Sequence, residues 1–179
     1  GGSDRIIHLW QMVDGQLIIV QTFYGHRDGI LHLAFSPSGH LLASSSLDRT
    51  VRLWDTSTGE CRQIFRSSNR LVHALAFSPD GQSLVSGSDD GQIYRWPLTD
   101  ESADGQAEIT TDGVEPLTTL PGGCSTLAFS PDGETLAGAG PDHMIFLWRA
   151  DDGDPLLTIK TPVNSTVYAV AFRPHQAPQ

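Results

Sequence analysis

The sequence predicts an all-β fold built from repeated units, and three observations support this prediction. One spacing recurs, because a Phe precedes a Trp by 19 positions in Phe35–Trp54, Phe77–Trp96 and Phe129–Trp148. The four Trp residues stand 44, 42 and 52 positions apart, which indicates an internal repeat with one insertion. Short β-branched and apolar runs alternate with Gly-containing and Pro-containing turns, a pattern typical of strands joined by tight turns.

The chain begins with the end of one repeat, residues 1–23. Asp4 stands six positions before Trp10, and an Asp stands at the same distance before each later Trp. Residues 16–23, QLIIVQTF, are β-branched and apolar and lie between the Asp14-Gly15 pair and Gly25. They predict a strand.

Three more repeats are predicted at residues 24–65, 66–116 and 117–160, followed by a repeat start at 161–179. The first has expected strands at 30–36, 40–45, 52–54 and 61–65. The second has expected strands at 71–77 and 82–86 and a strand ending at Trp96, and the third at 125–129, 134–138 and 144–148. A last strand is expected at 166–172, which brings the predicted total to 15.

The extra residues of the long interval lie in an acidic segment, residues 99–115. The segment contains acidic but no basic residues, namely Asp100, Glu101, Asp104, Glu108, Asp112 and Glu115. Low hydrophobicity and charge of one sign predict a mobile, solvated loop. The alternative interpretation is an acidic strip that docks a partner.

The repeat period, the Gly25-His26 pair near the start of a repeat and the Trp54-Asp55 pair at its end resemble the WD-repeat (WD40) family of β-propellers. The resemblance implies a propeller segment of four-stranded antiparallel blades, with strands a to d. It implies face-to-face packing of the blades through apolar residues of strand a, namely Leu33, Phe35, Leu75, Phe77, Leu127 and Phe129. The chain is short for a propeller of this family, so we expect a segment of a longer propeller, or one that associates with further copies.

The resemblance also implies a buried hydrogen-bonded set of His, Ser or Thr, Asp and Trp in each blade. Only one repeat carries the full set, His26, Ser44, Asp48 and Trp54, and there a neutral imidazole can bridge a carboxylate to a hydroxyl. The Asp recurs in the turn between strands b and c as Asp4, Asp90 and Asp142. The positions equivalent to His26 are Ser68, Leu120 and Val163, so the other blades are expected to depend on apolar packing.

Composition narrows the classes of partner. The formal net charge is -10, from 11 basic and 21 acidic residues, which argues against binding to nucleic-acid phosphates. No apolar run approaches the roughly 18 residues that span a bilayer, so no membrane partner is expected. Cys61 and Cys124 form no disulfide framework and no metal-ligand pair, which favours a reducing compartment and a cytoplasmic location.

No catalytic, cofactor-binding or metal-binding motif is found, and the chain is not expected to be an enzyme. His32 and His73 are the metal-capable nitrogens of the expected strands a, but they stand at different offsets and would point to opposite strand faces. Residues 151–154, DDGD, lack the glutamate and the spacing of an EF-hand loop. A hydrolase or lyase on a propeller scaffold stays the less favoured alternative.

The function that the resemblance implies is non-catalytic recognition of a protein or peptide through the loops at one rim. Small molecules prefer concave pockets over such flat surfaces. Leu47 is the foremost candidate, because it is apolar in an otherwise polar turn; the alternative is a side chain packed against the neighbouring turn. The candidate contact residues are Arg27, Asp28, Leu47, Arg49, Asn69, Arg70 and Asp89. Another alternative is the sensor region of a larger signalling enzyme, such as a nucleotide-driven switch or a kinase.

Overall fold

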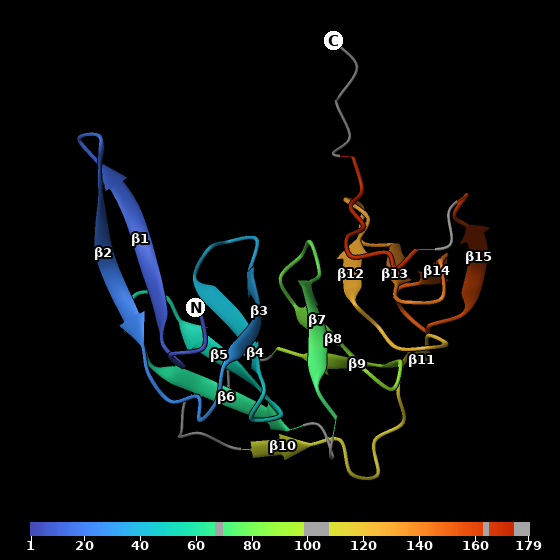
Figure 1. The fold of residues 1–179 in the computed structure, drawn as a ribbon, viewed down its shortest axis with the longest axis horizontal. Coiled ribbons are helices and arrows are strands. Elements are labelled where there is room, and N and C mark those ends of the chain that lie inside the picture. Colours follow the sequence, from blue (N-terminus) through green and yellow to red (C-terminus); the bar gives the residue numbers. More distant parts are fainter. Residues whose placement is uncertain (67–69, 99–107, 163–164, 174–179) are drawn as a thin grey trace. The chain divides into compact units, whose positions relative to one another are not determined.

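The computed structural model describes residues 1–66, 70–98, 108–162 and 165–173. These residues form strands and turns without any helix, as the all-β prediction requires (Figure 1). The chain divides into two compact units, which are described separately below. Unit 1 comprises residues 1–72 and 99–114, and unit 2 comprises residues 73–98 and 115–179.

Unit 1 begins with a two-stranded hairpin of β1 (Ile7–Val13) and β2 (Gln16–Phe23). Asp14 and Gly15, which join the strands, both have positive φ, as a two-residue hairpin turn requires. The hairpin matches the predicted strands c and d of the first blade. Its pairing shifts register between Leu9 and Trp10, and the same shift recurs before Trp54 and Trp148 in their blades. The extra residue stands on the fourth strand each time, as Val20, Arg62 or Leu156, so this β-bulge is a repeated feature of the pairing between the third and fourth strands.

The second blade contains β3 (Ile30–Phe35), β4 (Leu41–Ser46), β5 (Thr50–Asp55) and β6 (Cys61–Arg66), each antiparallel to the next. A fifth strand, β10 (Glu108–Thr110), pairs in parallel with the outer strand β6. This strand lies within the acidic segment, so the prediction of a loop across 99–115 was wrong for residues 108–110. Residues 99–107 of the segment lie outside the described part of the chain.

The core of unit 1 lies between the β1–β2 hairpin and the second blade. It buries Ile7, Phe23, Leu42 and Trp54, and the rings of Phe23 and Trp54 stand 5.8 Å apart. Leu33 and Phe35 of β3 are 37% and 51% exposed, so the prediction that they bury between blades was wrong. The hairpin has two strands where a complete blade has four, and its two strands leave these side chains of the inner strand β3 uncovered.

Unit 2 consists of two four-stranded sheets. The third blade contains β7 (Val72–Phe77), β8 (Ser83–Ser88), β9 (Gln92–Pro97) and the short β11 (Thr118–Thr119). The fourth blade contains β12 (Thr126–Phe129), β13 (Thr135–Ala139), β14 (Met144–Arg149) and β15 (Pro155–Lys160).

The two sheets of unit 2 share one apolar core, as the packing prediction requires. Leu127 and the indole of Trp148 are buried in it together with residues of the third blade such as Val85 and Ile93, and Phe129 packs against it half-buried. Leu75 and Phe77 of β7 are also buried. The predicted packing is therefore found in unit 2 for Leu127 and Phe129, whereas Leu75 and Phe77 are buried without belonging to this core.

The predicted last strand, residues 166–172, is not a strand. Two hydrogen bonds hold this segment in unit 2: the Val167 N–H donates to the Gly140 carbonyl at 3.1 Å, and the Val170 N–H donates to Thr126 Oγ1 at 3.2 Å. A strand a needs the strand b of its own blade as a partner, and the described residues contain none for it. The described residues contain 15 strands, the same number as expected, because the unexpected strand β10 offsets the loss of the expected strand at 166–172.

The described residues contain no helix that is long and apolar enough to cross a membrane.

Candidate functional site

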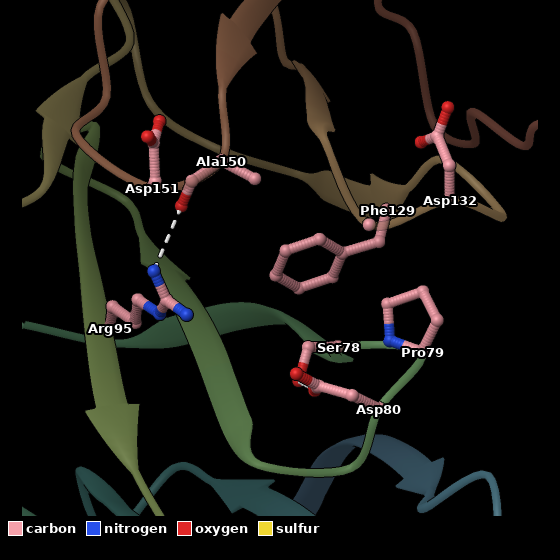
Figure 2. A pocket seen from close by; sticks show the side chains of 9 residues that line it. Ser78, Pro79, Asp80, Arg95, Phe129, Asp132, Ala150 and Asp151 are labelled. Carbon is pink, nitrogen blue, oxygen red and sulfur yellow. Dashed lines mark hydrogen bonds between the residues drawn. The ribbon is translucent and has the colours of Figure 1, made fainter.

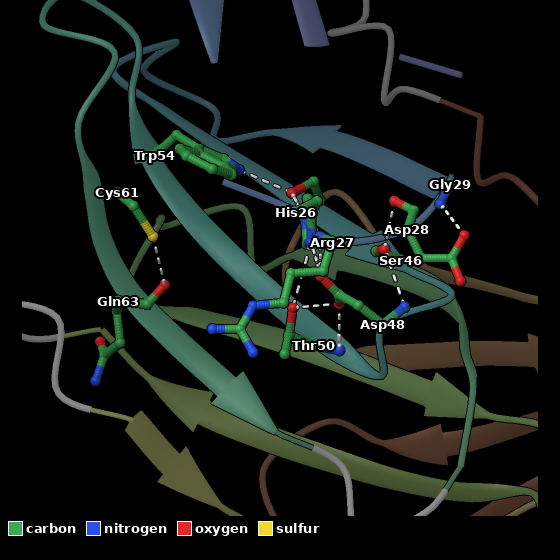
Figure 3. A network of polar contacts seen from close by, with 11 residues as sticks. His26, Arg27, Asp28, Gly29, Ser46, Asp48, Thr50, Trp54, Cys61 and Gln63 are labelled. Atoms are coloured by element: carbon green, nitrogen blue, oxygen red, sulfur yellow. Dashed lines mark hydrogen bonds and ion pairs between the residues drawn. The ribbon is translucent and has the colours of Figure 1, made fainter. Parts of the chain in front are cut away.

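Unit 1 contains a buried polar network of His26, Ser44, Asp48, Thr50 and Trp54 (Figure 3). The Trp54 indole N–H donates to Ser44 Oγ at 2.8 Å, so the Ser44 hydroxyl proton is left to donate to His26 Nε2 at 2.7 Å. His26 Nδ1 then carries the ring proton and donates a hydrogen bond to Asp48 Oδ2 at 2.9 Å. The four residues that the sequence pattern predicted to associate are thus in contact, joined by Thr50.

Asp48 is the acceptor at the end of this network. Burial by itself would raise the pKa of the Asp48 carboxyl, but hydrogen bonds from His26, Thr50 and the Arg27 backbone N–H together hold that pKa well below its usual range. Asp48 is therefore a carboxylate at neutral pH. An ionised acceptor strengthens each of the hydrogen bonds that it receives.

The network joins the loop after β2 to the turn after β4. Arg27 N–H donates to Asp48 Oδ2 at 2.8 Å, the Leu47 N–H donates to the Gly29 carbonyl at 2.9 Å, and Ser46 Oγ donates to the Asp28 carbonyl at 3.0 Å. Both loops are thus fixed by hydrogen bonds at their backbones. Four of the candidate contact residues stand on these loops with exposed side chains, namely Arg27, Asp28, Leu47 and Arg49.

Leu47 has features of both interpretations of its sequence position, a partner contact and a side chain packed against the neighbouring turn. A Cβ placed on Gly29 would lie 3.4 Å from Leu47 Cδ1, so the side chain rests against the neighbouring loop. It is nevertheless 42% exposed. Leu47 therefore presents a supported apolar surface to solvent.

The other candidate contact residues are placed as follows. Arg70 is exposed in unit 1, and Asp89 is exposed in unit 2 in the turn between β8 and β9. Asn69 lies outside the described residues.

In the other b–c turns, Asp4 and Asp90 accept hydrogen bonds within their own turns, whereas Asp142 contacts a different loop. Asp4 accepts a hydrogen bond from the Ile6 N–H at 3.2 Å, and Asp90 accepts one from the Gln92 N–H at 3.1 Å. The Asp142 carboxylate lies against Gly122, where a Cβ would come within 2.3 Å of its Oδ1 atom. Each of these turns therefore uses a short acidic side chain.

The expectation that the other blades depend on apolar packing was wrong for the third blade. Trp96 Nε1–H donates to Ser86 Oγ at 2.9 Å in a buried hydrogen bond, which matches the Trp54–Ser44 half of the network. In the fourth blade Gly138 takes the place of this serine, and the Trp148 ring packs so close that a Cβ would lie 2.8 Å from Cζ3. The signal was present in the sequence, because Ser44, Ser86 and Gly138 all stand ten positions before their Trp.

Unit 2 contains a shallow pocket of about 140 Å³ at the turns of its two sheets (Figure 2). Arg95 crosses it, with Nη1 donating to the Ala150 carbonyl and Nε donating to Ser83 Oγ, both at 3.2 Å. Asp80 and Asp132 each accept a hydrogen bond from the hydroxyl of the serine that begins their own turn, Ser78 for Asp80 and Ser130 for Asp132. The polar groups of this pocket thus serve to hold the turns and to join the two sheets.

Unit 1 contains a larger pocket of about 290 Å³ that the sequence patterns did not reveal. Arg27, Arg52 and Arg66 line it together with Asp48 and Glu108. The strand register explains the grouping, because Thr50 pairs with Arg66 and Arg52 pairs with Ile64, so both guanidinium groups lie on one face. Recognising it from sequence would have required the β5–β6 register and the position of β10.

The two histidines considered as metal ligands belong to different units. Burial lowers the pKa of His32, and its Nδ1 atom is buried without a hydrogen-bond partner. His73 is half-buried in β7. Across the described ranges, no three His, Cys, Asp or Glu side chains gather where they could hold a metal ion.

A family model described as "WD domain, G-beta repeat" matches residues 17–55, 59–97 and 114–149. The chain is 40% identical over 70 residues to the nuclear distribution protein PAC1 of Gibberella zeae, which covers 38% of this chain and 15% of that protein. It is 39% identical over 67 residues to human striatin-4, covering 32% of this chain and 9% of striatin-4.

A third relative is subunit I of eukaryotic translation initiation factor 3 from Aspergillus niger, 37% identical over 63 residues, which covers 35% of this chain and 18% of the subunit. The alignments thus span less than a fifth of each of these relatives. The three matched repeats cover more than half of the chain, and their strands form the sheets described above. The chain belongs to the WD40 repeat family.

Proposed function

We propose that this chain is a non-catalytic scaffold that binds a protein or peptide through the two loops fixed by the His26–Asp48 network. WD40 repeat proteins generally act as scaffolds for protein interactions. One observation carries the proposal for this chain: the backbones of the β2–β3 loop and the β4–β5 turn are joined by hydrogen bonds, while four side chains point to solvent. Loops that are ordered before binding lose little conformational entropy when a partner arrives.

The chemistry of this surface suits a protein partner. Arg27 and Arg49 stand on the same two loops as Leu47, whose side chain rests against Gly29, and arginine is enriched in binding hot spots. Arg70 of unit 1 and Asp89 of unit 2 belong, by sequence position, to the corresponding loops of the next blade, and each stays a candidate contact within its own unit. Such a surface fits a folded domain or a peptide better than a small molecule.

The hairpin of unit 1 suggests a second partner, further propeller blades from the rest of a longer chain or from another copy. Its apolar side chains are exposed on both strands, including Trp10 at 51%, Met12 at 61% and Leu17 at 61%. An apolar surface of this kind favours association, and β1 and β2 supply two of a blade's four strands.

The predicted repeat boundaries, 24–65, 66–116 and 117–160, form part of the proposal, as does a cytoplasmic location. Both cysteines are free thiols, which supports a reducing compartment.

Quantitative affinity capture from a cell lysate tests the binding surface. Leu47→Asp places a charge on it, and His40→Asp is a matched control because His40 is exposed just before the start of β4, whereas Leu47 follows its end. We expect at least one protein to be captured by the wild type and by His40→Asp but depleted at least about fivefold by Leu47→Asp, a loss of about 1 kcal/mol. Capture of the same proteins in equal amounts by all three would contradict the proposal.

A further inference from the structure

The pocket of unit 1 lined by Arg27, Arg52 and Arg66, named here the arginine pocket, contains three cations in a chain of net charge -10. Two carboxylates, Asp48 and Glu108, face them. Asp48 already accepts hydrogen bonds from His26, Thr50 and the Arg27 backbone, so its oxygens are used within the loop network. Glu108 is therefore the carboxylate that is available to pair with the guanidinium groups of the pocket.

Glu108 reaches the pocket because it stands on β10. Its side chain forms an ion pair with Arg66 of β6, and both side chains are 42% exposed. The pair raises the pKa of Arg66 and lowers that of Glu108. The backbone follows the same edge, since the Thr111 N–H donates to the Arg66 carbonyl at 3.1 Å, next to the parallel pairing of 108–110 with 64–66. An acidic strand thus lies on the outer edge of a blade and places a carboxylate in the arginine pocket.

The arginine pocket retains unused donor capacity with Glu108 in place. Arg52 Nε is buried without an acceptor, and its guanidinium lies over the Trp54 ring at 5.7 Å from the centroid. A buried donor without a partner is costly, which indicates that a second anionic group would be favourable here. One glutamate side chain supplies two oxygens, whereas three guanidinium groups can bind several carboxylates.

We propose that the arginine pocket and the outer edge of β6 form a docking site for an extended acidic segment of a partner protein, which β10 occupies in the free chain. The partner would add a strand to β6 and place its carboxylates among Arg27, Arg52 and Arg66, so that backbone pairing supplies affinity and the arginines supply selectivity. The site extends beyond the loop surface proposed above and shares only Arg27 with it. The tests below leave Arg27 and Leu47 unchanged, so the two proposals can fail separately.

The probe is a fluorescein-labelled peptide with the sequence of residues 108–115, Glu-Ile-Thr-Thr-Asp-Gly-Val-Glu, and the readout is fluorescence anisotropy. The wild type should bind it weakly, because a tethered strand competes at an effective concentration of the order of millimolar. An open variant replaces residues 99–114 by Thr-Ser-Thr-Gly-Glu, the sequence of residues 56–60 that joins β5 to β6. It should bind the peptide at least about tenfold more tightly than the wild type.

Two substitutions in the open variant separate charge recognition from general affinity. Arg66→Gln should weaken peptide binding about tenfold, whereas Arg62→Gln, in the same strand but paired with Asp55, should leave it unchanged. A control peptide has Gln and Asn in place of the Glu and Asp residues. The open variant should bind this control peptide as weakly as its Arg66→Gln form binds the acidic peptide. Raising NaCl from about 50 mM to about 500 mM should weaken binding of the acidic peptide only.

Several results would overturn the proposal. One such result is failure of the open variant to bind the acidic peptide although circular dichroism shows that it is folded. Another is equal binding of the peptide by the Arg66→Gln and Arg62→Gln variants. Tighter binding of a single-stranded DNA oligonucleotide than of the peptide would assign the pocket to phosphates instead. If the open variant does not fold, Glu108→Gln in the full chain replaces it, with an expected gain in peptide affinity of about twofold to fivefold; unchanged affinity would then refute the proposal.

Discussion

Removing the Ser44 hydroxyl, at the centre of the His26 network, should lower the free energy of unfolding about twice as much as removing the equivalent Ser86 hydroxyl of the third blade. Ser44 Oγ accepts from the Trp54 indole and donates to His26 Nε2, and the side chain is fully buried. Ser44→Ala therefore leaves two buried polar groups without a partner. Ser86 Oγ accepts from the Trp96 indole, so Ser86→Ala removes one described buried hydrogen bond where Ser44→Ala removes two.

The magnitude follows from the cost of an unsatisfied buried group, about 1–3 kcal/mol. Ser44→Ala should lower the free energy of unfolding by roughly 2–6 kcal/mol and Ser86→Ala by roughly 1–3 kcal/mol, since the lost methylene-sized volume is the same in both. Because the positions are equivalent in their blades, each variant is the matched control of the other.

Urea unfolding monitored by Trp fluorescence and by far-ultraviolet circular dichroism measures both values. Because the chain has two compact units, coincidence of the two probes should be checked before a free energy is assigned. Equal destabilisation by the two variants, or a loss below about 1 kcal/mol for Ser44→Ala, would refute the proposed division of hydrogen bonds.

Three further predictions follow from the same geometry. The folded-state pKa of Asp48 lies well below its unfolded value, so its contribution to stability is complete above about pH 4 and declines as the pH falls toward the folded-state pKa. Asp48→Asn should be less stable than the wild type at pH 7, and urea melts should show this difference shrinking steadily as the pH falls from about 4 to about 2, whereas a constant difference would contradict this. Burial raises the pKa of Cys124 to about 12, so iodoacetamide labelling followed by mass spectrometry should find this thiol at least about a hundredfold slower in the native protein than in urea, and equal rates would be evidence against its burial. Gly138→Ser should destabilise by about 1–3 kcal/mol, because the new Cβ would meet Trp148 and Leu127 at 2.8 and 3.1 Å, and a gain in thermal stability would show that the serine restores a hydrogen bond instead.

The recurring Phe-to-Trp spacing predicted the order of strands because each repeat builds the same sheet from the same local signals. Alternation, turn residues and the fixed position of the Asp are local features, so the strands around Trp54, Trp96 and Trp148 lie where they were expected. The His26–Ser44–Asp48–Trp54 set was recognised by its resemblance to a family pattern, and the donor-only indole then determined the direction of its hydrogen bonds.

The features that sequence reasoning missed depend on neighbours distant along the chain. The pairing of β10 with β6 joins residues 44 positions apart and leaves no periodic signal in so short a strand. Leu33 and Phe35 have the pattern of buried residues, but their burial depends on strands of an adjacent blade. Residues 166–172 likewise have the pattern of a strand without an available partner.

The binding of a captured partner to purified variants tests the scaffold account most directly. Isothermal titration calorimetry would compare the wild type with Leu47→Asp and with His40→Asp. The account predicts a dissociation constant at least about tenfold larger for Leu47→Asp and an unchanged one for His40→Asp, because an apolar anchor in an ordered loop contributes more than about 1.4 kcal/mol. The same dissociation constant for all three proteins would contradict it.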